Sequence, residues 1–248
     1  MKDETNPVIK AITLNKADMQ SAATERVNEI AREFTEGFKF LADYPKTVTF
    51  FGSTQSREGE LYYDKARSLS SRIVKELGYS VVSGGGPGIM EAADRGAFEA
   101  GGDSIGLLIK LPDAQPTNNY IKKSISFYYF FARKVCLAFG AEVFIFFPGG
   151  FGTLDEFFEI ITLVQTRKIT GAPLICFGSE YWNKVKDLMR TEMLSKGMIT
   201  EEDINLFTIT DSEDEIIEAI KKVPITENVP FNAMKEAVEA GIIPAKQD

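Results

Sequence analysis

The sequence of 248 residues contains no histidine. Without an imidazole, the chain has no Ser-His-Asp triad, no Cys-His pair and no histidine-rich catalytic zinc site. Any acid–base step must therefore use a carboxylate, a lysine, a tyrosine or water. Cysteine is scarce as well. Cys136 and Cys176 both lie in apolar stretches, which predicts buried free thiols in a reducing compartment rather than a disulfide framework.

Long apolar runs are also absent. The strongest, residues 127–132 and 143–147, are far too short to span a bilayer, and residues 1–10 lack the apolar stretch of a secretory signal. We therefore expect a cytoplasmic protein that does not associate with membranes. The 28 Lys and Arg residues against 36 Asp and Glu residues give a net charge of −8, which argues against general binding of nucleic acid.

Short apolar segments alternate with amphipathic ones along most of the chain. Hydrophobic residues make up 44% of the sequence, enough for the core of an α/β domain. The spacing predicts strands over 47–51, 79–82, 104–109, 143–147, 173–177 and 206–209, and helices over 24–41, 62–77, 89–100, 126–140, 154–167, 180–195 and 213–222. Residues 110–123 are expected to form a polar loop. We expect a flexible tail over 1–22, one domain over 23–223 and an irregular tail over 224–248.

The expected strands are continuous runs of β-branched and aromatic residues. Such runs are typical of a parallel sheet buried on both faces, and the repeated strand–helix units predict a doubly wound, Rossmann-like α/β fold. A ligand in such a fold binds beyond the carboxyl ends of the strands. Three glycine-bearing loops follow strands there: 52–54 with Gly52 and Ser53, 83–88 with Gly85 and Gly86, and 148–153 with Gly149, Gly150, Gly152 and Thr153.

The loop over 148–153 lies in the stretch PGGFGTLDE, where a strand ends and a helix begins. The free N–H groups and the dipole of such a helix start form an anion site, for which phosphate is the natural occupant. A structural alternative exists, because Thr153 and Glu156 have the spacing of a capping box, which needs no ligand. Three glycines in four positions favour close approach of a ligand, since a cap needs only one turn residue.

The loop over 83–88 reads SGGGPG, which differs from a dinucleotide fingerprint in its glycine spacing. The next strand also ends in Ile109-Lys110 rather than in an acid for a ribose hydroxyl, so the sequence disfavours NAD and leaves tight helix–sheet packing as the alternative. Arg133 and Lys134 form a basic pair in an aromatic helical segment, where they are either a solvated pair or one placed for a ligand. Tyr128 and Tyr129 favour packing over base stacking.

Three motifs together resemble the Lonely Guy (LOG) family: SGGGPGIMEA from Ser83, the pair Arg133-Lys134, and PGGFGTLDE from Pro148, within residues 48–182. Its members are cytokinin riboside 5′-monophosphate phosphoribohydrolases and related nucleotide nucleosidases, many of them labelled lysine decarboxylase. The resemblance implies hydrolysis of a nucleoside 5′-monophosphate, such as AMP or a cytokinin riboside monophosphate, to a free base and ribose 5-phosphate. It further implies catalysis by Arg133 and Glu156, no metal or other cofactor, and a homodimer with the aromatic helix around Arg133 near the interface.

The same resemblance and the three converging loops assign residues to substrate binding: Gly52, Ser53, Gly85, Gly86, Lys134, Gly149, Gly150, Gly152, Thr153 and Thr162. Plant-type members carry GGGSxGLMG where this chain has GGGPGIME from Gly84, which leaves the preferred base open. Asn119 and Tyr120 could meet the base or ribose, although a surface loop is favoured. A nucleotide-binding or carrier protein without turnover is the alternative function. A pyridoxal-phosphate lysine decarboxylase is rejected, because no lysine lies in a Schiff-base setting.

Overall fold

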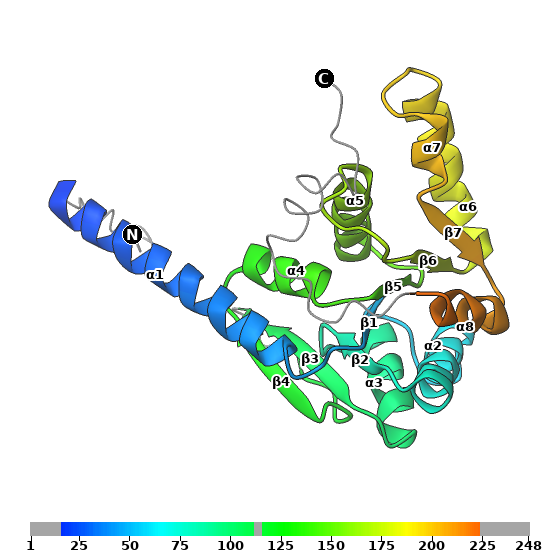
Figure 1. The fold of residues 1–248 in the computed structure, drawn as a ribbon, viewed down its shortest axis with the longest axis horizontal. Coiled ribbons are helices and arrows are strands. Elements are labelled where there is room, and N and C mark those ends of the chain that lie inside the picture. The colour runs from blue at the N-terminus through cyan, green and yellow to red at the C-terminus, as the bar shows by residue number, and fades with distance from the viewer. Residues whose placement is uncertain (1–15, 112–115, 224–248) are drawn as a thin grey trace, which may run out of the picture.

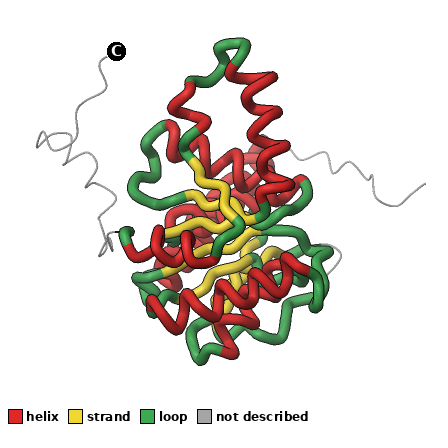
Figure 2. Tube along the Cα trace, turned by 90° about the vertical axis from the view of Figure 1, so that its right-hand side faces the viewer, coloured by secondary structure: helices red, strands yellow, loops and turns green. Residues whose placement is uncertain are grey.

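The computed structural model describes residues 16–111 and 116–223. At its centre lies a seven-stranded sheet with the strand order β4-β3-β2-β1-β5-β6-β7 (Figures 1 and 2). The strands are β1 (Thr47–Phe51), β2 (Ser80–Ser83), β3 (Ser104–Ile109), β4 (Lys123–Phe127), β5 (Val143–Phe146), β6 (Leu174–Phe177) and β7 (Phe207–Thr210). All neighbouring strands are parallel, which confirms the predicted doubly wound α/β fold.

Helices cover both faces of the sheet. They are α1 (Lys16–Leu41), α2 (Leu61–Arg72), α3 (Ile89–Glu99), α4 (Phe130–Phe139), α5 (Phe151–Gln165), α6 (Ser179–Leu188), α7 (Glu201–Ile204) and α8 (Glu213–Lys221), with π-helical turns η1 (Ile73–Leu77) and η2 (Met189–Leu194). One core cluster joins the sheet to α2, α3 and α8, and the other joins it to α1, α4, α5 and α6. The two layers bury the central strands on both faces, whereas the edge strand β4 has exposed residues.

Strand β5 shows why the expected strands are apolar throughout. Val143 and Ile145 pack into the cluster on the α2–α3–α8 face, whereas Phe144 and Phe146 pack into the opposite cluster, and all four are fully buried. Successive side chains of a strand point to opposite faces, so a strand covered on both sides needs apolar residues at every position.

The order of the strands places a crevice at β1 and β5. From β1 the chain adds β2, β3 and β4 on one side, and it then returns to pair β5 with the other side of β1. This reversal is the topological switch point of a doubly wound sheet, where ligands bind outside the carboxyl ends of the strands. Of the three glycine-bearing loops, 52–54 and 148–153 follow the two strands at that point, and 83–88 follows the adjacent β2.

The N-terminal helix is longer than the sequence predicts. It begins at Lys16 rather than at residue 24, and therefore inside the expected tail over 1–22. Residues 20–28 are all exposed, so burial gives no pattern there, although the local composition of alanine, lysine, methionine and glutamine favours helix. Figure 1 shows α1 extending far beyond the sheet. Residues 1–15 and the expected tail over 224–248 lie outside the described residues.

Strand β4 was not expected. The sequence predicts a loop to residue 123 and a helix from 126, but Lys123–Phe127 pairs with β3 at the edge of the sheet, and α4 begins only at Phe130. Lys123, Ser124 and Ser126 are exposed, so the strand lacks the apolar run of the central strands. The short helix α7, which starts with a capping box at Thr200, was also missed.

Cys136 and Cys176 are buried free thiols, as the sequence predicts, and burial raises the pKa of Cys136 to about 12. Across residues 16–111 and 116–223, none of the helices combines the length and apolarity needed to cross a membrane. The cytoplasmic location stays a prediction.

Candidate active site

Backbone hydrogen bonds join the three glycine-bearing loops at the carboxyl edge of the sheet. The Ser53 N–H donates to the Pro148 carbonyl at 3.0 Å, and the Ser53 carbonyl accepts from the Ile89 N–H at 2.9 Å. Gly88, with φ of 75°, lies so close to this strand end that an added Cβ would be 2.2 Å from the Ser53 oxygen. Loop 52–54 thus lies between the other two, and the convergence expected from the sequence is confirmed.

A cavity of about 400 Å³ opens between these loops, α4 and α5. Its polar wall comes from loops 52–55 and 150–153 and from Arg133, Lys134, Asp155 and Glu156, and its apolar wall includes Met90, Ile109, Leu111, Phe130 and Leu137. Phe130 is 55% exposed and Phe151 is 95% exposed, so two aromatic rings stand at the mouth. The cavity therefore offers charged groups beside a surface suited to a flat or apolar group.

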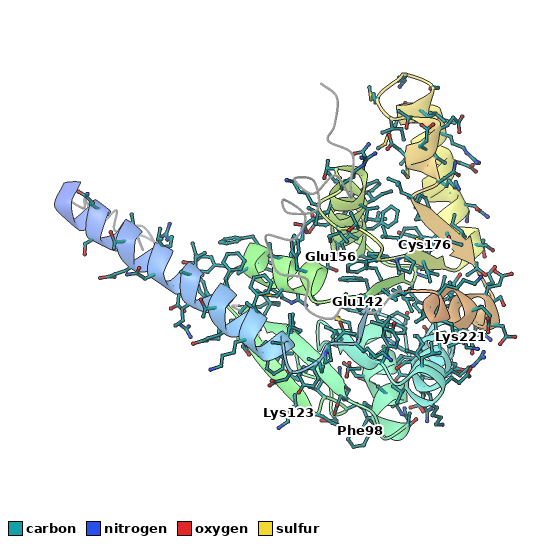
Figure 3. The ribbon with its side chains drawn as sticks, in the orientation of Figure 1. Phe98, Lys123, Glu142, Glu156, Cys176 and Lys221 are labelled. Atoms are coloured by element: carbon teal, nitrogen blue, oxygen red, sulfur yellow. The ribbon has the colours of Figure 1, made fainter. Side chains whose placement is uncertain are left out.

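Glu156 lies in the second turn of α5 (Figure 3). It is one of the residues that line the cavity. Its carboxylate makes no hydrogen bond or ion pair with any residue in the described part of the chain. Burial raises the pKa of Glu156 to about 7, and the positive charges of Arg133 and Lys134 oppose that rise. A carboxyl group with these properties changes its protonation state near neutral pH and is free to bind water or a ligand.

Arg133 projects from the first turn of α4 and is 8% exposed. Its Nε donates a hydrogen bond of 2.7 Å to the Leu107 carbonyl at the end of β3. The guanidinium also passes directly over Gly84, where an added Cβ would lie 2.1 Å from Nη2. Burial lowers the pKa of Arg133, and the negative charge of Glu156 offsets this effect only in part. The guanidinium thus has one fixed end and a terminal group at the cavity.

Lys134 lines the cavity but is already paired. Its Nζ is 2.8 Å from Asp155 Oδ2 and 2.7 Å from Glu159 Oε2, and its side chain is 16% exposed. Burial lowers the pKa of Lys134, but the hydrogen bonds to the two carboxylates outweigh this effect and raise it. These ion pairs join α4 to α5, and so they hold Arg133 and Glu156 on facing helices.

The structural alternative for the start of α5, a capping box of Thr153 and Glu156, is wrong. The helix begins at Phe151 with Gly150 as its N-cap, and no side chain caps it. Thr153 therefore lies inside the first turn, where it is buried and fills the space beside Gly149. Because no side chain caps the helix, the first N–H groups of α5 have neither intrahelical partners nor a side-chain acceptor. The local geometry thus agrees with an anion site rather than with a self-contained cap.

The structure brings together eight of the residues predicted for the site. The cavity is lined by Arg133, Glu156, Gly52, Ser53, Lys134, Gly150, Gly152 and Thr153, whereas Gly85, Gly86, Gly149 and Thr162 are not among its lining residues. Thr162 lies near the end of α5, where its hydroxyl donates to the Phe158 carbonyl at 2.7 Å. Asn119 is exposed, and Asn119 and Tyr120 do not line the cavity either.

Sequence reasoning missed a buried network behind loop 83–88. The Asp94 carboxylate on α3 accepts hydrogen bonds of 2.7 Å from Ser83 Oγ and from Asn118 Nδ2. Asn118 in turn holds the carbonyls of Gly85 and Gly86 through its own N–H and its Nδ2. These two glycines therefore shape the loop instead of lining the cavity. No motif marked Asp94 or Asn118, because their partners come from three separate segments.

Burial raises the pKa of Asp94 to about 7, and its hydrogen bonds with Asn118 and Ser83 lower it only in part. Asp94 Oδ1 has no hydrogen-bond partner in the described part of the chain. Residues 16–111 and 116–223 contain no group of three or more cysteine, aspartate or glutamate side chains arranged to hold a metal ion.

A family model with the description "Possible lysine decarboxylase" matches residues 90–220. The cytokinin riboside 5′-monophosphate phosphoribohydrolase LOG5 of Arabidopsis thaliana is 32% identical over 121 residues, which cover 48% of this chain and 53% of the relative. The rice enzyme LOG (Oryza sativa subsp. japonica) is 32% identical over 124 residues, covering 49% and 50%. The chain thus spans about half the length of these two relatives.

A longer alignment joins the chain to LOG1 of Arabidopsis thaliana, with 26% identity over 204 residues, 81% of this chain and 94% of the relative. Among solved structures, the molybdenum cofactor carrier protein of Chlamydomonas reinhardtii has a TM-score of 0.53 at 20% identity, covering 72% of this chain and 97% of its own. The molybdenum cofactor binding protein of Rippkaea orientalis has a TM-score of 0.52 at 21% identity, covering 71% and 94%. These two structures share the fold.

Proposed function

Because the chain belongs to the Lonely Guy (LOG) family, matched here as possible lysine decarboxylases, we propose that it hydrolyses the N-glycosidic bond of a nucleoside 5′-monophosphate. The products are a free base and ribose 5-phosphate. The observation that carries this proposal is the Glu156 carboxylate, which lines the cavity beside Arg133 without a hydrogen-bond partner in the described residues.

The start of α5 is the proposed phosphate site. The N–H groups of its first turn have no intrahelical partners, and Gly150 and Gly152 leave open space where side chains would otherwise stand. A phosphate held there is remote from the scissile bond. Its binding energy therefore serves to position the ribose against the reacting groups.

Glu156 is the proposed catalytic carboxylate. Cleavage of an N-glycosidic bond develops positive charge on the ribose, and an ionised carboxylate stabilises that charge and orients or deprotonates the attacking water. Arg133 holds the phosphate or ribose through its terminal guanidinium nitrogens, and its charge also favours the ionised form of Glu156. The electron pair of the broken bond leaves with the base, the water hydroxyl goes to C1 of the ribose, and the water proton, taken up by Glu156, ends on the base nitrogen.

The base is proposed to lie against the apolar wall formed by Met90, Ile109, Leu111, Phe130 and Leu137. That wall accepts a purine and leaves the choice between adenine and a base with an apolar substituent to experiment.

The test is incubation of the purified protein with a panel of nucleoside 5′-monophosphates, including AMP and a cytokinin riboside monophosphate, followed by chromatography. We expect equal amounts of free base and ribose 5-phosphate. Parallel incubation with the unphosphorylated nucleosides tests the phosphate site, because these should react far more slowly. Absence of base release from every member of the panel contradicts the proposal.

Binding without turnover is the second candidate. Two observations support it: Lys134 is occupied by Asp155 and Glu159, and two proteins of the same fold are described as a cofactor carrier and a cofactor-binding protein. Ligand that stays bound through purification, with no base released, would favour this candidate over hydrolysis.

A homodimer is also proposed. Aromatic side chains of the α4 region are exposed around Arg133, namely Tyr128, Phe130, Phe131 and Phe139. Apolar patches of this kind commonly cover one another in assemblies. Light scattering coupled to size-exclusion chromatography should give twice the mass of the chain, and Phe131→Glu should shift it to the monomer. A monomeric wild-type protein contradicts the proposal.

A further inference from the structure

The start of α4 is held by a side chain from another helix. The residues before its first turn, Tyr128 and Tyr129, make no side-chain cap of their own. Instead, Glu33 of α1 accepts hydrogen bonds from the Tyr128 N–H at 2.5 Å and from the Tyr129 N–H at 3.2 Å. Glu33 is only 4% exposed. Its negative charge faces the positive end of the α4 dipole, which stabilises a carboxylate there.

Close packing between α1 and α4 fixes how far Glu33 lies from the start of α4. An added Cβ on Gly37, one turn after Glu33, would lie 2.6 Å from Cys136 Sγ on α4. The rings of Phe34 and Phe131 also meet, with their centroids 6.3 Å apart. The Glu33 carboxylate is thus carried by a helix that has little freedom to shift along α4.

A short chain of contacts leads from Glu33 to Arg133. The Tyr129 N–H is bound by Glu33, and the Tyr129 carbonyl accepts the first hydrogen bond of α4, from the Arg133 N–H at 3.2 Å. The Arg133 side chain is then fixed at its other end, by Leu107 at 2.7 Å. The direction in which Arg133 enters the cavity therefore depends on where Tyr129 is held.

Glu33 has no ion-pair partner within 4.0 Å in the described part of the chain. A buried carboxylate is costly unless its oxygens are well bound, and removing it would leave two amides without an acceptor. Exposed acids of the same helix differ, since Glu29 and Glu36 pair with Arg32 at the surface.

We propose that Glu33 is a positioning residue, which sets the start of α4 and thereby aims Arg133 at the substrate. This inference rests on the proposed function, and it gives α1 a role in the reaction although no residue of α1 lines the cavity. Glu33 acts through the backbone of Tyr129 and does not contact the substrate.

The first test compares Glu33→Ala and Glu33→Gln with the control Glu36→Ala, an exposed acid on the same helix. We expect Glu33→Ala to lower kcat/KM for AMP by about 10- to 100-fold, because small displacements of a reacting group cost that much. Glu33→Gln keeps one acceptor oxygen and should fall between Ala and wild type. Glu36→Ala should stay within about twofold. Equal activity of Glu33→Ala and wild type overturns the proposal.

A double-mutant cycle separates positioning from general loss of structure. If Glu33 acts through Arg133, then adding Glu33→Ala to Arg133→Ala causes no further loss of activity. Additive losses overturn the proposal. The pH profile is a second readout, since Glu156 is faced by Arg133 and Lys134 from α4 and by Asp155 and Glu159 on α5. Displacing Arg133 should move the inflection of kcat/KM for Glu33→Ala to higher pH, whereas a loss of folded protein would not move it.

Two measurements keep this test independent of the proposed function. If wild type releases no base, the dissociation constant for AMP replaces kcat/KM in the same cycle. Hydrogen exchange of the peptide covering residues 128–134 needs no ligand, and we expect faster exchange in Glu33→Ala than in Glu36→Ala. Unchanged exchange in Glu33→Ala overturns the positioning role even if hydrolysis is demonstrated.

Discussion

Asp94 and Glu156 are two carboxyl groups whose pKa burial raises to about 7, but their surroundings differ. Asp94 is fully buried and bound by Ser83 and Asn118, so it holds a loop in place. Glu156 has no such partners, and it meets the cavity and the charge of Arg133. A perturbed carboxyl group therefore does not by itself mark a catalytic residue. Its hydrogen bonds and its access to a cavity distinguish an anchor from a reacting group.

The largest expected effect is on Glu156. Glu156→Gln keeps the shape of the side chain but removes the charge and the basic oxygen, so kcat for AMP should fall by about 10²- to 10⁴-fold. The melting temperature should not fall, because no hydrogen bond in the described residues is lost. Base release assayed by chromatography checks this, with Glu180→Gln, an exposed acid on α6, as the matched control. Wild-type rates in Glu156→Gln would remove Glu156 from the mechanism.

Asp94 should behave in the opposite way. Asp94→Ala leaves Ser83 and Asn118 without their acceptor in a buried site, so the free energy of unfolding should fall by about 2–3 kcal/mol. Asp94→Asn keeps an acceptor oxygen and should cost much less. Urea unfolding followed by circular dichroism measures both. An Asp94→Ala variant as stable as wild type would show that the hydrogen bonds of Asp94 do not contribute to the free energy of unfolding.

Gly84 and Gly96 offer a matched pair of glycine-to-alanine changes. In Gly84→Ala the new methyl group would lie 2.1 Å from Arg133 Nη2, at the free end of a long side chain. The guanidinium should move, and kcat/KM should drop by about tenfold or more with little change in stability. In Gly96→Ala the methyl group would lie 2.1 Å from the Arg67 carbonyl oxygen, which is backbone. Gly96→Ala should therefore lose stability instead. If Gly84→Ala lost stability but kept its activity, the proposed role of Arg133 in the site would be contradicted.

The smallest effect concerns the pH dependence of stability. Burial raises the pKa of Asp94 from its ordinary value of 3.8 to about 7, so folding favours its protonated form. Its contribution to stability is therefore complete below about pH 4 and is lost as the pH rises toward 7. Relative to wild type, Asp94→Asn should gain on the order of 1 kcal/mol or more between pH 5 and pH 8. Parallel stability curves for the two proteins would contradict the raised pKa.

The buried strands were predictable because burial on both faces leaves a plain sequence signal. β1 (Thr47–Phe51) and β3 (Ser104–Ile109) begin and end where the sequence predicts. β4 gave no such signal, since an edge strand exposes Lys123 and two serines. The missing strand also displaced the predicted start of α4, because no apolar run separated the loop from the helix.

The site was predictable where one short motif supplies several lining groups, as loop 148–153 and Arg133-Lys134 do. It was not predictable where function depends on contacts between distant segments. Glu33 lies 95 residues before Tyr128, and Asp94 lies 24 residues before Asn118. Thr162 lies on the same helix as Glu156 but does not line the same cavity, so a shared helix does not by itself place two side chains together, and its role in substrate binding stays a prediction.

The most direct test of the central claim is kcat/KM for AMP between pH 5 and pH 9, in wild type and in Glu156→Gln. With no histidine in the chain, the ionisation of Glu156 should set the profile, and kcat/KM should rise through an inflection near pH 7. Glu156→Gln should stay at the low rate across the whole range. A Glu156→Gln variant with the wild-type inflection and rate would contradict hydrolysis by this carboxylate.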